Sequence, residues 1–167
     1  MKLAGHLIHP MLVVFPLGLF ATAVVFDLVA IASGHGGWHA IAYWMIAAGI
    51  IGGLLAATFG LLDFLGIPRN TRARSVGLWH GAGNVLVVTL FAASWLVRRS
   101  EPAHPAAIAL ALSFVGAGIS LVAGWLGGEL VQRLGMGVDE GAHPNAPSSL
   151  SGRPASSGDT RRPRRAA

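Results

Sequence analysis

Histidines recur at the edges of long apolar segments in this chain, and carboxylates lie within or beside them. Each of four apolar segments has a histidine near its first residue: His9, His39, His80 and His104. Asp27 and Asp63 lie towards the ends of the first and second segments. Imidazole and carboxylate groups can bind a metal ion, and imidazole can also bind haem iron. Because ionisable residues are costly to bury in apolar surroundings, they tend to mark function there.

The apolar segments that position these residues are long enough to cross a membrane. Hydrophobic residues make up 53% of the chain and charged residues only 11%. A transmembrane helix needs roughly 20 mostly apolar residues. The sequence therefore predicts an all-α, four-helix transmembrane bundle within residues 1–138, with sequential antiparallel packing because the loops are short. The expected spans are about 10–33, 38–62, 76–97 and 105–131.

The first segment has a competing interpretation as a secretory signal peptide. Lys2 precedes the apolar run, and residues 30–33 resemble a cleavage site. The run is longer than the usual apolar region of a signal peptide and contains Asp27, which favours a retained span. Within that span, Pro16 removes a backbone hydrogen bond, so we expect a bend just before it.

The basic residues predict how the bundle is oriented. An even number of spans places both termini and the middle loop on one side, which carries most of the Lys and Arg residues, whereas the other side has only Arg98 and Arg99. The positive-inside rule then predicts a bacterial cytoplasmic (inner) membrane protein with both termini in the cytoplasm. Residues 139–167, rich in Pro, Ser, Gly and Ala, are expected to form a disordered basic tail. Beside four spans this tail favours anionic lipid, and no nucleic-acid partner is expected.

Alternating topology sorts the candidate site residues into two groups. The cytoplasmic group comprises His9, Asp63, His80 and Asn84, which we predict to bind a cofactor, or a metal ion through the two histidines and Asp63. Imidazoles at helix starts should stay neutral, with a lone pair for a metal. The outer group is a second candidate metal cluster: Asp27, His39 and His104.

An ordinary structural interpretation accounts for each of these histidines taken singly. Proline, which follows two of them, is favoured at the first position of a helix, and tryptophan, which precedes the other two, belongs to the membrane interface. The chain has no cysteine, which excludes disulfides, thiolate metal sites and covalent c-type haem. It also has no nucleophile–base arrangement, P-loop or zinc-protease motif, so an enzyme acting alone is not expected.

Four motifs carry a family resemblance. They are GHLIHPMLVVFPLGLFATAVVFDL at residues 5–28, LLDF at 61–64, the H-x-x-x-N of His80 and Asn84, and GWLGGELVQRLGMGV at 124–138. Together they resemble the bacterial membrane family called domain of unknown function 2231. The matching positions are His9, Pro10, Pro16, Asp27, Asp63, His80, Asn84, Gly127, Gly128 and Glu129. Many relatives have histidine where this chain has Val14 and Leu134.

The resemblance implies a four-span protein without an established activity, whose relatives include chains joined to Rieske-type iron–sulfur or cytochrome-like domains. It therefore favours a small membrane redox subunit that binds haem b or quinone near the cytoplasmic surface. Its expected partners are the lipid bilayer, a respiratory cytochrome or iron–sulfur protein, and a second copy of the chain. A protein that handles a metal or small solute, and a non-catalytic structural subunit of a larger membrane complex, remain as alternatives.

Overall fold

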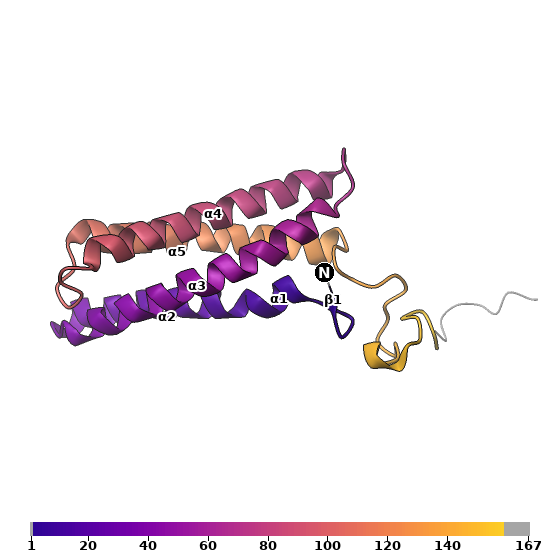
Figure 1. Cartoon of the computed structure of the whole chain (residues 1–167), viewed down its shortest axis with the longest axis horizontal. Coiled ribbons are helices and arrows are strands. Elements are labelled where there is room, and N and C mark those ends of the chain that lie inside the picture. Colours follow the sequence, from indigo (N-terminus) through magenta and orange to yellow (C-terminus); the bar gives the residue numbers. More distant parts are fainter. Residues whose placement is uncertain (1, 159–167) are drawn as a thin grey trace, which may run out of the picture.

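The computed structural model describes residues 2–158, and its long helices form a four-helix bundle (Figure 1). An antiparallel hairpin of β1 (Lys2–Leu3) and β2 (His6–Leu7) precedes the helices. The helices are α1 (Ile8–Leu12), α2 (Val14–Ser33), α3 (Gly37–Leu65), α4 (Arg72–Arg98) and α5 (Ala107–Gly128). A π-helical turn, η1 (Glu129–Arg133), continues α5, and a short 3-10 helix, η2 (Ser149–Ser151), follows.

The four predicted spans are confirmed as helices long and apolar enough to cross a membrane. These spans are Ile8–Ser33, Gly37–Leu65, Arg72–Arg98 and Ala107–Arg133. The third begins earlier than expected because Thr71 caps it, its hydroxyl accepting a hydrogen bond from the Arg74 amide at 3.2 Å. His80 therefore lies in the third turn of α4 rather than at its first turn, away from the helix end.

The helices pack in antiparallel order, α2 against α3 and α4 against α5, with α3 joining the two pairs (Figure 1). The hairpin, the α3–α4 loop and residues 134–158 lie at one end of the bundle, which we call the proximal end. The α2–α3 and α4–α5 loops lie at the other, the distal end. Large apolar side chains such as Trp44 and Leu121 are exposed along the helices, as a lipid-facing surface requires.

The centre of the bundle is an apolar core that separates its two ends. Phe20 and Phe91 stack with ring centroids 4.0 Å apart, and Ile46 and Val87 pack around them. A Cβ atom on Gly49 would lie 2.5 Å from Cε1 of Phe20, so the absence of a side chain at Gly49 makes room for the phenylalanine ring. Polar groups at the two ends are therefore separated by a dry, close-packed layer.

The first span is interrupted where the sequence predicts a bend. α1 ends at Leu12 and α2 begins at Val14, four and two residues before Pro16, respectively, so the helix is interrupted at Val13; the predicted bend itself stays a prediction. Proline has no amide hydrogen to bond the carbonyl of Leu12. Pro16 is buried, and a Cβ on Gly52 would lie 3.3 Å from its Cδ, so the proline ring packs against the backbone of α3.

The part of the tail that the structure describes is folded back on the N-terminal hairpin. Lys2 pairs with Asp139, and the hydroxyl of Ser149 donates to the carbonyl of Ala4 at 3.1 Å. Residues 139–158 thus form turns and η2 rather than extended chain. Residues 159–167 lie outside the described residues, and the disorder predicted for them stays a prediction.

Candidate functional site

Two histidines from different spans meet at the proximal end. His9 lies on α1 and His80 on α4, and their ring centroids are 6.3 Å apart with the ring planes at 87°. Each metal-binding nitrogen must come within about 2 Å of its ion. The pair is therefore close enough to share one ion, which alternating topology alone could only suggest.

The backbone of two other helices holds both imidazoles in one tautomer. Nδ1 of His9 lies 2.9 Å from the carbonyl oxygen of Ala56 on α3, and Nδ1 of His80 lies 2.8 Å from that of Ala123 on α5. A carbonyl oxygen only accepts, so each Nδ1 carries the hydrogen. A neutral ring in this tautomer has its lone pair on Nε2, the arrangement common among metal-ligating histidines. At His80 that nitrogen lies 3.3 Å from Nδ2 of Asn84.

Glycines create the space for these rings. A Cβ on Gly60 would lie 2.9 Å from Nδ1 of His9, and one on Gly127 would lie 3.0 Å from Cε1 of His80. Both distances are shorter than ordinary contacts, so a larger residue would displace the imidazole. The small residues that the sequence places on α3 and α5 therefore serve this pair as well as helix packing.

Asn84 lies against the same histidine, one turn further along α4. Its Nδ2 donates to the carbonyl of His80 at 2.8 Å and lies 3.3 Å from Nε2 of the ring. Asp63 lies on α3, partly buried and one turn beyond Gly60. A role of Asp63 as ligand or ligand partner stays a prediction.

Two arginines at the start of α4 contact neighbouring segments. Arg72 pairs with Glu129 at 2.7 Å, and Arg74 donates to the carbonyl of Phe64 at 2.6 Å and lies over its ring. Within residues 2–158 no group of three or more His, Cys, Asp or Glu side chains has the spacing of a metal site. A role of the proximal pair as metal ligands therefore stays a prediction.

A second polar network is fully buried at the distal end. Arg98 donates from Nη1 and Nη2 to the two carboxylate oxygens of Asp27, at 2.8 and 2.7 Å, and neither side chain is exposed. Nδ1 of His39 lies 2.7 Å from Oδ1 of the same carboxylate. Asp27 and His39, two members of the predicted second metal cluster, thus lie together, but the main partner of Asp27 is Arg98, which the sequence marks only as an orientation signal.

Two serines complete this distal clamp. Arg98 donates from Nε to the hydroxyl of Ser94 at 3.1 Å and from Nη2 to that of Ser113 at 3.0 Å. Ser94 in turn donates to the carbonyl of Ala109 at 2.6 Å. The clamp joins α2, α3, α4 and α5, and the bidentate arginine–carboxylate geometry is the strongest form of such a pair. Its donors and acceptors are already matched, which suits a structural role.

His104, expected in this second cluster, lies apart from the clamp. It sits in the α4–α5 loop before α5 begins, its side chain is 73% exposed, and Nδ1 lies 3.4 Å from Glu101. α5 begins at Ala107, later than the predicted start at residue 105, so His104 lies in the loop before the helix.

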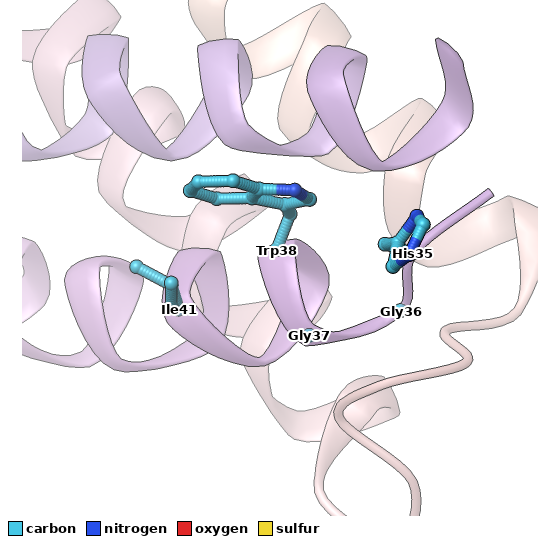
Figure 2. Close-up of a pocket in the computed structure, with 5 residues that line it drawn as sticks. All are labelled: His35, Gly36, Gly37, Trp38 and Ile41. Atoms are coloured by element: carbon cyan, nitrogen blue, oxygen red, sulfur yellow. The ribbon is translucent and has the colours of Figure 1, made fainter. Parts of the chain in front are cut away.

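An open cavity of about 350 Å³ lies at the distal end, lined by residues 35–38 and Ile41 (Figure 2). Trp38 rises from the start of α3 and stacks on Phe26, with ring centroids 5.2 Å apart. A second hollow, of about 300 Å³, lies between residues 140 and 156. Neither of these two cavities is lined by the proximal histidines.

Comparison with known proteins supplies a family and no activity. No curated protein and no solved structure matches the chain. The four confirmed spans, the histidine of the first motif and the H-x-x-x-N of α4 agree with the resemblance seen in the sequence. The chain belongs to the family described as "Predicted membrane protein (DUF2231)", whose model matches residues 5–140.

Proposed function

We propose that the chain is a small membrane redox subunit in which His9 and His80 together hold a transition-metal centre. One observation carries the proposal. Two imidazoles from separate spans lie 6.3 Å apart with each Nδ1 bonded to a backbone carbonyl, and Nε2 of His80 now accepts from Asn84, which a bound metal would displace. Imidazole suits iron and copper, and either metal would supply one-electron chemistry when bound.

The same two ligands fit two sources of metal: the iron of haem b or an ion bound directly. The donor chemistry suits both. The packing favours the ion, because Gly60 and Gly127 hold the two rings close to helix backbone. A macrocycle would need the helices to separate at these glycines, whereas an ion needs only small movements of the rings. We therefore take copper as the first occupant to test.

The residues around the pair would position the ligands. Asn84 donates to the carbonyl of His80 and contacts its ring, which restricts the rotation of that imidazole. Asp63, one turn from Gly60 on α3, is the nearest candidate carboxylate along that helix for a third donor or for charge compensation. A redox centre also needs an electron partner, and we propose a respiratory cytochrome or iron–sulfur protein docking at the proximal end.

The proposed orientation places that proximal end in the cytoplasm. The proximal end carries four exposed basic residues: Lys2, Arg69, Arg72 and Arg133. Arg98, at the distal end, is buried in the clamp and paired with Asp27. The orientation signal is thus stronger than the sequence suggests, since one of the two outer arginines is not exposed. A periplasmic reporter fused after Ala167 should stay inactive, and an active reporter would reverse the orientation.

Purification followed by visible absorption and elemental analysis tests the function. A Soret band identifies haem, and copper or iron near one equivalent without that band identifies a bound ion. Either signal should be lost in His9→Ala and His80→Ala and kept in His35→Ala, which removes an exposed histidine. A quinone extracted in place of a metal would move the redox role to an organic carrier. Failure to bind copper or haem even on reconstitution would leave the structural-subunit alternative.

A further inference from the structure

We propose that residues 2–12 form a movable flap that carries His9 onto and away from the metal site, and that residues 134–151 latch the flap closed. The flap consists of the β1–β2 hairpin and α1. This inference rests on the proposed function, because the flap regulates access to the same site. It makes the protein a gated metal-binding subunit that loads from the proximal side.

The hinge of the flap is the interruption before Pro16. α1 has five residues, which is too short to be stable as an isolated helix. It is joined to α2 through Val13, whose amide bonds the carbonyl of His9 at 3.0 Å, while Pro16 has no amide hydrogen to give. Val13 keeps helical angles, so rotation at this point would break the bonds from Val13 to His9 and from Leu17 to Val13 while leaving the rest of α2 intact.

The flap packs along α3 without fully burying any residue of α1. None of the residues of α1 is buried, in contrast to Phe20, Ala23 and Asp27 on α2. Its polar attachment is the bond from His9 to the carbonyl of Ala56 on α3. Segments with little buried apolar surface open most readily. His9, which lies on the flap, is therefore held less firmly than His80, which lies in the third turn of the long helix α4.

The latch consists of three contacts between chain segments that are far apart in the sequence. Lys2 pairs with Asp139, and the hydroxyl of Ser149 donates to the carbonyl of Ala4. Leu7 packs over Gly137, whose Cβ, if present, would lie 2.6 Å from the leucine Cδ1. These contacts fix the hairpin, and the hairpin leads directly into α1. They therefore influence the position of His9 although none of them involves His9 itself.

The other end of the bundle is built to stay closed. Asp27 and Arg98 have no exposed surface, and their clamp joins four helices. The latch pair, in contrast, is half exposed, at 47% for Lys2 and 48% for Asp139. Water and salt compete with such an exposed pair but hardly reach the buried one. Opening should therefore be confined to the proximal end.

A reversible cross-link tests the latch on the full chain in lipid nanodiscs. The chain has no native cysteine, so Lys2→Cys with Asp139→Cys can be bridged by a short, reducible, bifunctional thiol reagent. The probe is Cu(I), followed by competition with a chromophoric chelator. Bridging should slow both uptake and release of Cu(I) by at least about tenfold and leave the equilibrium affinity unchanged, as expected for a gate. Cleaving the bridge and alkylating the two freed thiols, which would otherwise bind Cu(I) themselves, should restore both rates, and unchanged rates after bridging would overturn the proposal.

Hydrogen exchange provides a readout that does not depend on metal. Amides of residues 8–12 should exchange faster than those of residues 20–33, and Asp139→Asn should speed exchange in residues 3–12 only. Glu140→Gln is the matched control, since it removes the adjacent exposed charge and leaves the Lys2 pair intact. Equal protection of the two stretches, or no response to Asp139→Asn, contradicts the flap. Exchange that behaves as expected in a protein that binds no Cu(I) would refute the metal function alone.

Discussion

The guanidinium of Arg98 and the carboxylate of Asp27 face each other through two hydrogen bonds of 2.8 and 2.7 Å, and no solvent reaches either side chain. They come from α4 and α2, helices that are not adjacent in the sequence. Bringing both charges out of water is costly, and the pair recovers that cost only because Ser94, Ser113 and His39 complete its hydrogen bonds. The clamp therefore fixes which helix faces meet at the distal end.

Removing one member of this pair should destabilise the bundle strongly. Arg98→Met leaves the Asp27 carboxylate buried without its counter-charge, and we expect a loss of about 3–5 kcal/mol in unfolding free energy. The double variant Asp27→Leu with Arg98→Met should recover most of that loss. Reversible unfolding in detergent measures the effect, and Arg99→Met, at the exposed neighbouring arginine, is the control. Equal stability of Arg98→Met and the control would remove the clamp from the account.

Alanine at the two glycines of the proximal site should weaken metal binding. In Gly60→Ala and Gly127→Ala the new methyl group would lie 2.9 and 3.0 Å from the imidazoles of His9 and His80, and the rings must move away. We expect lower Cu(I) affinity with helix content unchanged. Gly118→Ala is the control, because a Cβ there meets no atom within 4 Å. Cu(I) affinity in the two site variants equal to that of the control would show that the rings are not held by these glycines.

The latch should weaken in acid. The hydrogen bond from Lys2, together with its charge, lowers the pKa of Asp139 below its ordinary value. A lowered pKa in the closed state means that the latch is strongest above the ordinary pKa of aspartate and is lost as pH falls through the lowered value. A nitroxide on Leu3→Cys should become more mobile over that range.

The same label in an Asp139→Asn background serves as the control for this titration. It should be mobile at every pH, because the amide cannot form the ion pair. A pH response that persists in this background would assign the effect to another group, of which His6 on the same hairpin is the closest titratable candidate in sequence.

Restoring the missing amide should stiffen the hinge. Pro16→Ala supplies a donor for the carbonyl of Leu12, so α1 and α2 should join into one helix. Hydrogen exchange at residues 12–16 should slow, and Cu(I) release should slow with it. Faster exchange at these residues would show that packing of the proline ring against Gly52, and not the lost hydrogen bond, governs this region.

The sequence predicted the elements of this fold well because the signals are local. Length and hydropathy define the four spans, and Pro16 alone marks the interruption of the first. Alternation of the spans was enough to place His9 and His80 at one end. What it could not predict was the contact between their rings, which depends on how α1 and α4 rotate about their own axes.

The inward orientation of Arg98 could not be predicted from the sequence. A lone arginine at the end of a span ordinarily extends its charge to the membrane surface, and its sequence context is the same when it turns inward. Ser94 and Ser113 bond that guanidinium, but a serine within an apolar span has the same sequence signal when it only packs between helices. An unpaired Asp27 inside the first span was the available signal, since a buried carboxylate requires a cationic partner.

X-ray absorption at the copper edge tests the central claim most directly, because it counts the imidazoles bound to the metal. The Cu(I)-loaded protein should show two imidazole nitrogens at about 2 Å, and His9→Ala and His80→Ala should each lose one of them. His35→Ala should keep both. Spectra that are identical in the native protein and in the His9 and His80 variants would contradict the account, since the metal would then be bound elsewhere.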